Sequence, residues 1–474
     1  MKAAVYTLGC KLNQCESEAL ASSFDSRGFF IGSVRDDSDI YIINTCTVTS
    51  KAEQKARRVI RKLSNEHPES AVIVTGCYAQ LDSDQLLLGS NVIVVPHDYK
   101  DDINKLPEHL EQKGIQPGPG FAEEIRAFFA NDIAAGPVIT ASEPGSGDAG
   151  PNPDRFWYDS VDFNYHTRAF LKIQDGCDNS CAYCRVTIAR GDSISLDADS
   201  VFSQFEALQQ QGYREVVLTG VNLTSYMSRG LDFAALLTKL AASAAQSAKA
   251  GNPSIRIRIS SLEPETIDER MVRAVESEFV CPHFHISVQS GSNRILSLMR
   301  RHNNREKIID AVERLRSVKD DPFFAADVIA GFPGESDEDF EQTLSLLEDC
   351  RFTFLHVFPY SSRPGTAAAA MKHQVPQRIA GERTEILRQL SARNFKIYAE
   401  SWIGREADVL LEEKKADKWI GTSGNYLKSA VCDILDNGDR QTLGSEVTRE
   451  GGICRAVIED VKTDYIYARF KKWL

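Results

Sequence analysis

Short apolar segments alternate with helical patterns over most of the 474-residue chain, and this alternation restricts the possible folds more than any other feature. Apolar strands are expected near residues 2–8, 40–44, 71–75 and 92–95, with helical patterns between them. Strands that alternate with helices pair in parallel. The sequence therefore predicts an N-terminal α/β domain with a parallel sheet over residues 1–113.

The alternation resumes after a break, and a second α/β domain is expected over residues 161–399. Its strand candidates, each followed by a helical pattern, are AFLKIQ, EVVLTG, SIRIRIS, HFHISV, FFAADVIAG and TFLHVF. Six strand–helix units predict a partial (β/α)6 barrel or a wide parallel sheet. The intervening residues 114–160 are rich in Gly, Pro and Ser and are predicted to form a flexible linker. Residues 400–474 carry short apolar runs separated by turn residues, which predict a small antiparallel β-barrel.

Composition restricts where the chain works and what it binds. The N-terminus has no sustained apolar core and no stretch approaches eighteen apolar residues, so a cytoplasmic protein without membrane contact is expected. Eleven cysteines, an odd number, favour metal or redox chemistry over a disulfide scaffold. The net charge of −12 argues against broad nucleic-acid affinity, so any RNA contact should be local.

Three cysteines lie close together after the first strand of the second domain. Cys177, Cys181 and Cys184 have the spacing C-x3-C-x2-C and are called the second triplet below. Such thiolates suit zinc or an iron–sulfur cluster. Zinc normally takes a fourth ligand, and no nearby residue supplies one at a usual spacing. A four-iron cluster on three thiolates instead leaves one iron free for S-adenosylmethionine, from which a 5′-deoxyadenosyl radical can form.

The second triplet, with Tyr183 before its last cysteine, resembles the signature of the radical SAM superfamily. In that family the segment after the second strand touches the methionine amino group, which implies a cofactor contact at Thr219 and Gly220. Glu263 and Gln289 also follow expected strands, where ligands bind in barrels of this kind. A simple strand-to-helix turn explains Gly220 equally well, and residues such as Glu263 and Gln289 are more often helix-start or turn residues than ligands.

Three further cysteines, Cys10, Cys46 and Cys77, each stand immediately after an expected N-terminal strand and are called the first triplet below. The carboxyl ends of parallel strands line one edge of a sheet, so these thiols should converge there. Buried structural cysteines would more naturally lie within the strands. Cys15 is expected to be a small buried residue.

Together these features resemble the methylthiotransferases, which combine an N-terminal α/β domain, a radical SAM domain and a C-terminal barrel of the TRAM type. The segments TLGCKLNQCESE, NTCTVTSKAEQKARRVIRK, TRAFLKIQDGCDNSCAYC and HVFPYSSRPGT look like the branch that acts on threonylcarbamoyladenosine in tRNA. The resemblance covers nearly the whole chain except the linker. The run after Gly191, DSISL, is less basic than that branch would suggest.

The resemblance implies an enzyme that inserts a methylthio group at C2 of N6-threonylcarbamoyladenosine next to the anticodon. It implies two [4Fe-4S] clusters, one on each triplet, with S-adenosylmethionine as methyl donor and radical source. The implied partners are the tRNA anticodon loop, an electron donor such as flavodoxin or ferredoxin, and a sulfur source. The alternatives are a methylthiotransferase acting on isopentenyladenosine in tRNA or on a ribosomal protein side chain, and a zinc-bearing RNA-binding module.

Two regions are candidates for holding RNA. Residues 51–62, KAEQKARRVIRK, have six basic residues against one acidic and should form a helix beginning near Cys46, suited either to phosphates or to a solvated helix face. In the C-terminal barrel, Tyr426 is a candidate base-stacking residue. Arg469, Lys471 and Lys472 form a candidate basic patch there.

Overall fold

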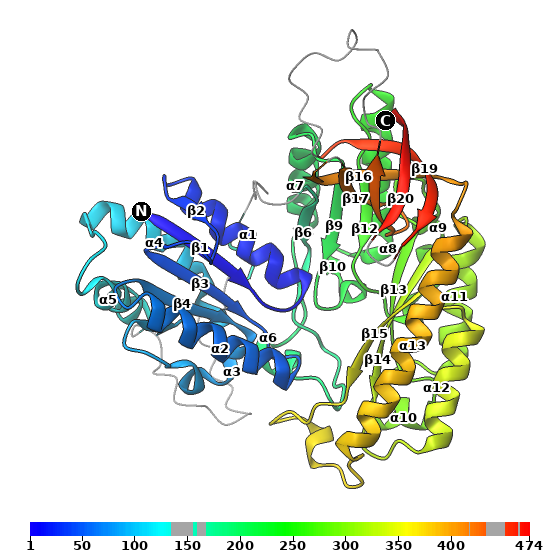
Figure 1. The fold of residues 1–474 in the computed structure, drawn as a ribbon, viewed down its shortest axis with the longest axis horizontal. Helices are drawn as coiled ribbons and strands as arrows, with labels where there is room; N and C mark the ends of the chain where they lie inside the picture. Colours follow the sequence, from blue (N-terminus) through cyan, green and yellow to red (C-terminus); the bar gives the residue numbers. More distant parts are fainter. Residues whose placement is uncertain (134–154, 159–166, 417, 433–450, 463–464) are drawn as a thin grey trace. The chain divides into compact units, whose positions relative to one another are not determined.

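The computed structural model describes residues 1–133, 155–158, 167–416, 418–432, 451–462 and 465–474 (Figure 1). The chain divides into two compact units. The first comprises Met1–Asn164, Asp175–Asn179 and Cys184–Asp192, and the second comprises Tyr165–Gln174, Ser180–Tyr183 and Ser193–Leu474. The residues around the second triplet are thus shared between the units, whereas the sequence predicted that they belong to the second domain alone.

The first unit is built on a fully parallel five-stranded sheet in the order β2-β1-β3-β4-β5. The strands are β1 (Lys2–Thr7), β2 (Phe30–Gly32), β3 (Ile40–Thr45), β4 (Ala71–Gly76) and β5 (Val92–Val94). The predicted parallel sheet is confirmed. Its two central strands, β3 and β4, are buried at every position, as expected for parallel strands covered on both faces.

Helices form two apolar cores with this sheet. The helices of the first unit are α1 (Lys11–Asp25), α2 (Ser50–Glu66), α3 (Cys77–Leu81), α4 (Lys100–Lys113), α5 (Phe121–Ile133) and α6 (Val186–Arg190), and all but α6 contribute to these cores. One core joins α1, α4 and α5 to the sheet, and the other joins α2 and α3 to it. The cores place the carboxyl ends of β1, β3 and β4 at one edge.

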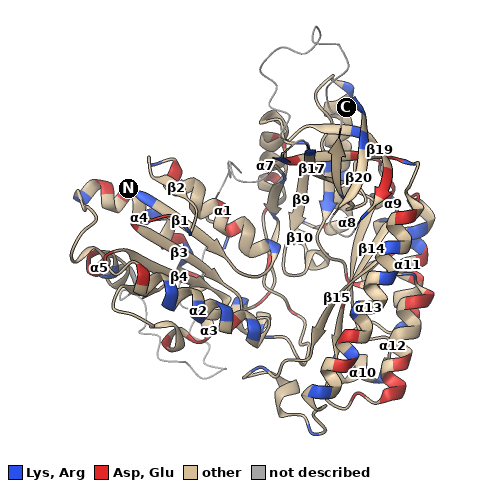
Figure 2. Ribbon diagram, in the orientation of Figure 1, with Lys and Arg blue, Asp and Glu red and all other residues tan. Residues whose placement is uncertain are grey.

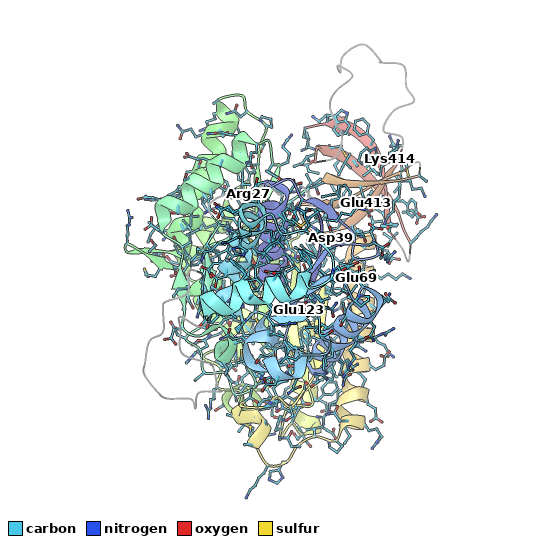
Figure 3. The ribbon with its side chains drawn as sticks, turned by 90° about the vertical axis from the view of Figure 1, so that its left-hand side faces the viewer. Arg27, Asp39, Glu69, Glu123, Glu413 and Lys414 are labelled. Carbon is cyan, nitrogen blue, oxygen red and sulfur yellow. The ribbon has the colours of Figure 1, made fainter. Side chains whose placement is uncertain are left out.

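Helix α5 corrects the prediction that residues 114–160 form a linker throughout. Phe121, Ile125 and Phe129 recur at helical spacing and are buried in the first core, whereas Glu123 lies on the exposed face of the helix (Figure 3). The Gly and Pro residues of 114–120 masked this amphipathic pattern. Residues 134–154 and 159–160 of the predicted linker lie outside the described residues.

The second unit contains six parallel strands in chain order, which confirms the predicted (β/α)6 arrangement. The strands are β6 (Ala169–Lys172), β9 (Glu215–Thr219), β12 (Arg256–Ile259), β13 (His283–Gln289), β14 (Phe323–Ala330) and β15 (Phe354–Pro359). They form two three-stranded sheets. Isolated parallel bridges connect these sheets, one from Ile257 on β12 to Val280 before β13, and one from Leu262 after β12 to Ile286 on β13. The carboxyl ends of all six strands therefore lie on one side, where a barrel of this kind binds its ligands.

Helices follow these strands, and most begin with a side-chain cap. They are α7 (Ala198–Gln210), α8 (Phe233–Lys249), α9 (Glu269–Glu276), α10 (Asn293–Leu298), α11 (Arg305–Val318), α12 (Asp337–Asp349) and α13 (Gln377–Ser401). Ser336 and Asp339 form a capping box at the start of α12. Such caps fix where each helix begins, and hence the length of the loop left at each strand end. Among the described residues no helix is long and apolar enough to cross a membrane.

A closed five-stranded barrel ends the second unit. Its strands are β16 (Glu406–Lys415), β17 (Lys418–Ser423), β18 (Lys428–Cys432), β19 (Ile453–Val461) and β20 (Ile466–Trp473). The predicted barrel is confirmed, with one difference in strand direction. β18 and β20 pair in parallel, while the other pairs are antiparallel.

Two arginines of β12 attach this barrel to the parallel sheet. Arg258 donates to the carbonyl oxygens of Ser423 and Gly424 at 3.0 Å, and Arg256 donates to those of Asp408 and Thr422. Glu215 on β9 pairs with both guanidinium groups at 2.7 Å. Buried charges of opposite sign thus lie against barrel carbonyls at the start of β9, the end remote from its ligand-binding edge.

Candidate cysteine-bearing site

The first triplet lies at one edge of the N-terminal sheet. Cys10, Cys46 and Cys77 follow the carboxyl ends of β1, β3 and β4, which are adjacent parallel strands (Figure 1). The backbone at Gly9 passes directly against Cys46, since a Cβ atom at Gly9 would lie 2.9 Å from the Cys46 sulfur. The fold therefore brings together thiols that are separated by up to 67 positions in the sequence.

Glycines make this close approach possible. Gly9 and Gly76 precede Cys10 and Cys77 and have φ angles of +105° and +97°. A Cβ at Gly76 would lie 2.4 Å from the carbonyl oxygen of Thr45. Glycine is required at both positions, because other residues rarely adopt this backbone region and have no room for a side chain here.

The electrostatics of the first triplet favour a cationic ligand. Burial, with smaller contributions from the sulfurs of Cys10 and Cys77, raises the pKa of Cys46 to about 12. The sulfurs of Cys10 and Cys77 therefore oppose the ionisation of Cys46 in the protein alone. An iron–sulfur cluster, which supplies positive charge and needs thiolate ligands, fits this set of donors. Cys15 is buried within α1, as expected, and shares a hydrogen bond of 3.2 Å with the Tyr158 hydroxyl.

A buried ionic network that the sequence analysis missed lies behind the first triplet. Arg190 contacts Glu16 and Asp175 at 2.9 Å, and Lys100 contacts Glu16 at 2.6 Å. Glu16, His97 and Asp175 bring metal-ligand atoms within 4.8 Å of one another. Because the Arg190 and Lys100 cations already neutralise the two carboxylates, these residues suit an ion-pair network better than a metal site.

Burial lowers the pKa of His97 in this network to about 3, so its ring is neutral near neutral pH. No local spacing could have indicated the network, since its members come from α1, α4 and the segments on either side of the second triplet. The one local sign of the network in the sequence is ARG at 189–191, where the buried Arg190 precedes Gly191, a glycine with a φ of +62°.

The members of the second triplet are described within their own units. In the first unit, Cys177 follows Gly176, whose φ is +68°, and the N–H of Cys177 donates to the carbonyl of Gly191 at 3.0 Å. Cys184 begins the segment that leads into α6. In the second unit, the sulfur of Cys181 lies 3.5 Å from Nη1 of Arg301. All three thiols are half-buried, so they are accessible to a ligand.

The predicted cofactor residues of the second unit stand at strand ends. Thr219 ends β9, and a Cβ at Gly220 would lie 2.8 Å from the side-chain oxygen of Gln174. Gln289 ends β13 with a φ of +65°, which is unusual for a residue with a side chain. A backbone held in this region at a strand end is typical of functional sites.

Glu263 and Tyr183 complete this group. Glu263 follows β12 and pairs with Arg301, the same arginine that contacts Cys181. Burial raises the pKa of Glu263, and the positive charge of Arg301 opposes that shift. The Tyr183 ring meets Phe332 edge to face, with 6.5 Å between ring centroids. That these residues bind S-adenosylmethionine stays a prediction.

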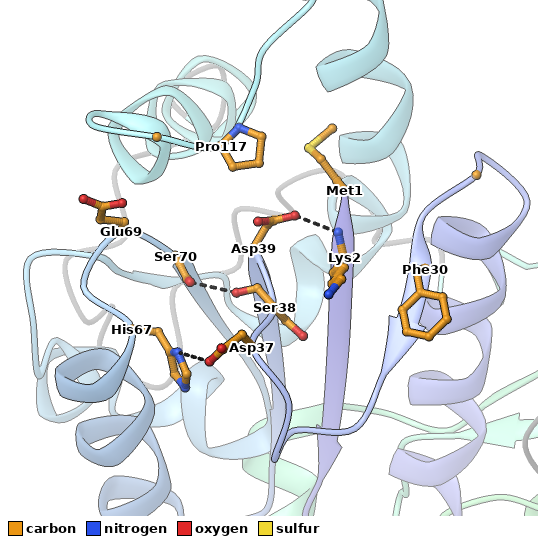
Figure 4. A pocket seen from close by; sticks show the side chains of 12 residues that line it. Met1, Lys2, Phe30, Asp37, Ser38, Asp39, His67, Glu69, Ser70 and Pro117 are labelled. Atoms are coloured by element: carbon orange, nitrogen blue, oxygen red, sulfur yellow. Dashed lines mark hydrogen bonds and ion pairs between the residues drawn. The ribbon is translucent and has the colours of Figure 1, made fainter.

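An open hollow of about 700 Å³ in the first unit lies away from the cysteines. Its lining includes Lys2, Asp39 and Ser70, which stand at or just before the starts of β1, β3 and β4 (Figure 4). The first triplet stands at the opposite ends of the same strands. Since parallel sheets bind ligands at the carboxyl ends of their strands, this hollow is not a candidate for the active site.

Helix α2 presents a basic face beside the first triplet. It begins at Ser50, four residues after Cys46, and Thr49 caps it by accepting the N–H of Ala52. Its exposed cations are Lys51, Lys55, Arg58, Arg61 and Lys62. Figure 2 shows Lys and Arg positions in blue along α2. Among the described residues, of these five only Lys62 has a carboxylate within 4 Å, that of Glu66. The predicted helix is confirmed, and its charge is available to an anionic partner.

The barrel residues proposed to hold RNA are largely engaged within the protein. The Tyr426 ring packs against His283 at 4.4 Å and against Arg258 at 5.0 Å between the barrel and the parallel sheet. The Tyr426 ring is partly buried by these contacts, and its role in stacking on RNA bases stays a prediction. Arg469 pairs with Glu459 and Lys471 pairs with Glu406, so their charges are already compensated.

Comparison with known proteins adds to these observations. Residues 171–347 match the radical SAM superfamily, and residues 2–95 match Uncharacterized protein family UPF0004. The Threonylcarbamoyladenosine tRNA methylthiotransferase MtaB of Treponema pallidum is 40% identical over 481 residues, covering 94% of this chain and 96% of that protein. The protein of that name from Aquifex aeolicus is 35% identical over 421 residues, covering 87% and 93%.

A relative with a different substrate in its name is also similar. The tRNA-2-methylthio-N(6)-dimethylallyladenosine synthase of Opitutus terrae is 32% identical over 452 residues, covering 89% of this chain and 90% of that protein. Among solved structures, the radical S-adenosylmethionine methyltransferase TsrM of Kitasatospora setae aligns with a TM-score of 0.51 at 14% identity, covering 77% and 73% of the two chains. That likeness shows a shared fold.

Proposed function

The chain belongs to the threonylcarbamoyladenosine tRNA methylthiotransferases, and from this we propose that it inserts a methylthio group at C2 of N6-threonylcarbamoyladenosine next to the anticodon of tRNA. The observation that carries the proposal is the convergence of Cys10, Cys46 and Cys77 at one sheet edge of a chain that also holds the C-x3-C-x2-C motif. A radical enzyme that inserts no sulfur would have no evident use for the first triplet.

The reaction explains why no side-chain base is needed at the reacting carbon. The C2 hydrogen of adenosine is not acidic, and general base catalysis contributes roughly 10²- to 10⁴-fold, too little to remove it as a proton. Cys177, Cys181 and Cys184 would hold an iron–sulfur cluster which, with S-adenosylmethionine, would supply the radical chemistry that can take this hydrogen as an atom, and Cys10, Cys46 and Cys77 would hold the cluster for sulfur transfer. The protein residues hold these groups and the substrate base in contact.

We assign the second triplet to the [4Fe-4S] cluster that binds S-adenosylmethionine, since it carries the superfamily motif. The first triplet is proposed to hold a second cluster, because its three sulfurs leave one iron without a protein ligand. Tyr183, Thr219, Gly220, Glu263 and Gln289 are proposed contacts of S-adenosylmethionine, supported by their places at strand ends. An external one-electron donor, such as flavodoxin or ferredoxin, and a sulfur source complete the proposed requirements.

The exposed basic face of α2 is proposed to contact tRNA phosphates. It begins at the edge that carries Cys46, so phosphates held there would place the anticodon loop near the first triplet. The paired arginine and lysine of the barrel support a smaller contribution from that region.

Mass spectrometry of tRNA nucleosides tests the proposed function. A strain lacking the gene should lose 2-methylthio-N6-threonylcarbamoyladenosine and accumulate the unmethylthiolated nucleoside, and the wild-type gene should restore it. The dimethylallyladenosine named for the Opitutus terrae relative is measured in the same digest. Loss of its methylthio derivative, with the threonylcarbamoyl nucleoside unchanged, would reverse the substrate assignment; no change in either would favour a protein substrate.

A further inference from the structure

Arg190 is a buried arginine whose hydrogen bonds connect the first triplet to the chain segment that follows the second. It is 1% exposed and ends α6, six positions after Cys184. Its Nε donates to the sulfur of Cys77 at 3.2 Å. A guanidinium so deeply buried needs a function that justifies its desolvation.

Every N–H group of this guanidinium has an acceptor. Nη1 donates to the carboxylates of Glu16 and Asp175 at 2.9 Å, and Nη2 donates to Asn13 at 2.9 Å and to Glu16 at 3.2 Å. The geometry is therefore fixed by a fork that a lysine could not reproduce. The other five hydrogen bonds of the guanidinium hold the bond from Nε to the sulfur in place.

Asn13 extends the contact to the rest of the triplet. Its side-chain oxygen accepts from Arg190 and lies 3.9 Å from the sulfur of Cys10. Its amide nitrogen donates to the carbonyl oxygens of Leu8 and Thr45, which stand just before Cys10 and Cys46. Arg190 thus touches one sulfur directly and fixes the backbone that presents the other two.

The charges around Arg190 are balanced. The carboxylates of Glu16 and Asp175 offset the cations of Arg190 and Lys100, and Lys100 also contacts Asn44 at 3.3 Å. The N–H group directed at sulfur therefore acts as an oriented dipole inside a network without net charge. In surroundings this dry, such a bond to sulfur has a strong effect on the charge that the sulfur can carry.

We infer that Arg190 is a positioning residue that sets the reduction potential of an iron–sulfur cluster on Cys10, Cys46 and Cys77. An N–H donor to a ligating sulfur favours the more negative, reduced form of a cluster, so it raises the potential. This inference rests on the proposed function, in which the first triplet holds a cluster of its own. It means that a segment leading out of one triplet controls how readily the other accepts an electron.

The test uses full-length protein in which Cys177, Cys181 and Cys184 are replaced by alanine, so that the first triplet is the remaining cluster site. The protein is labelled with ¹⁵N-arginine, reconstituted anaerobically and reduced by one electron with dithionite. Pulsed electron paramagnetic resonance should detect coupling between the cluster and an arginine nitrogen. R190K, which keeps the charge but not the fork, should lose the coupling and shift the midpoint potential to a more negative value.

A second variant protects the test against misfolding. E16Q/R190Q removes one cation and one anion together, so the network stays neutral, and it should show the same negative shift. In protein that lacks the first triplet instead, both variants should move the potential of the cluster on Cys177, Cys181 and Cys184 less. If neither variant loads iron, the test is the coupling between the cluster and an arginine nitrogen in the protein that retains Arg190: its presence supports the role of Arg190, and its absence overturns it.

The outcomes separate the two proposals. If the protein restricted to the first triplet binds no iron, the proposed cluster on Cys10, Cys46 and Cys77 is overturned. A load of about four irons, with no arginine coupling or with an unchanged potential in both loaded variants, overturns only the role of Arg190.

Discussion

The two cysteine triplets reach the same number of thiols by opposite routes. The second occupies eight consecutive positions, whereas the first spans residues 10 to 77 and depends on the pairing of β1, β3 and β4. A local motif can survive damage elsewhere in a domain, because neighbouring positions cannot separate. A triplet gathered from three strands depends on the register of the whole sheet.

The triplets also share two local devices. A glycine with positive φ precedes a cysteine in both, at Gly76 in the first and at Gly176 in the second. An arginine lies against one sulfur in both, with Arg190 at Cys77 and Arg301 at Cys181. The difference between the triplets therefore lies in how they are assembled, and less in what surrounds the sulfurs.

Replacing one cysteine in each triplet should have the largest effect and should separate their roles. We expect C46A and C181A each to lower the iron content from about eight to about four per chain and to abolish methylthiolation. C46A should still cleave S-adenosylmethionine to 5′-deoxyadenosine, because the second triplet is intact, whereas C181A should not. Iron analysis and chromatography of the cleavage product measure both. Retained methylthiolation in C46A would contradict a role for the first triplet in sulfur transfer.

The barrel attachment tests whether the second triplet is independent of distant parts of the second unit, which contains Cys181. E215Q leaves Arg256 and Arg258 without their buried carboxylate, which should destabilise the second unit by about 3–5 kcal/mol. Denaturant unfolding measures the loss. Below the unfolding transition, the second triplet should still load iron if its assembly is local; loss of that cluster in folded E215Q would show that it depends on the whole unit.

The carboxylate of Glu215 should also make the stability of the second unit depend on pH. Burial disfavours the charge on Glu215, yet the guanidinium groups of Arg258 and Arg256 outweigh it and hold the pKa well below the ordinary value of 4.5. The stabilisation is present above that ordinary value and is lost as the pH falls toward the folded-state pKa. We expect the wild type to lose stability on acidification, and E215Q to show a weaker dependence because it lacks the group.

Alanine substitutions of the glycines that precede Cys77 and Cys177 test the two triplets at matched positions. In G76A the new Cβ meets the carbonyl oxygen of Thr45, and in G176A it meets that of Asp192. G76A should destabilise the first unit by roughly 1–3 kcal/mol from strain and lose the first cluster. G176A should lose the second cluster with the sheet intact. Melting curves and iron counts distinguish these results.

Gly28 provides the control for these substitutions. It has a φ of +78° and no atom within 4 Å of an added Cβ, so G28A isolates the backbone cost, roughly 1–2 kcal/mol. We expect G28A to keep both clusters. A loss of iron in G28A equal to that in G76A would mean that general instability, and not the geometry at Thr45, empties the first triplet.

The same contrast explains what the sequence could predict. Strand and helix patterns are local, so the two α/β architectures, the barrel and both triplets followed from them. Strands β2 and β17 were not predicted. β2 has only three residues, and the sequence of β17, KWIGTS, lacks clear alternation of apolar and polar residues. Helix α5 escaped because the glycines before it suggested a linker. The partners of Arg190 and the packing of Tyr426 against His283 and Arg258 depend on contacts between distant segments, which no spacing encodes.

The basic face of α2 gives the smallest expected effect and asks whether RNA is held at the first triplet. K51Q/R58Q/R61Q removes exposed cations that have no carboxylate within 4 Å among the described residues, so folding should change by less than about 0.5 kcal/mol. Binding of an anticodon stem-loop should weaken. Each lost contact to a single-stranded phosphate should reduce the slope of log affinity against log salt by about 0.7.

The matched control is R469Q/K471Q in the barrel. Those cations already pair with Glu459 and Glu406, so their loss removes little free positive charge and should change the salt slope less. Binding of the stem-loop at several salt concentrations compares the two variants directly. Equal slopes for the wild type and the α2 variant, with a reduced slope for the barrel variant, would move the RNA contact from the edge of the first triplet to the barrel. The basic face of α2 would then be an ordinary solvated helix face, and the barrel would be the part of the protein that binds the tRNA phosphates.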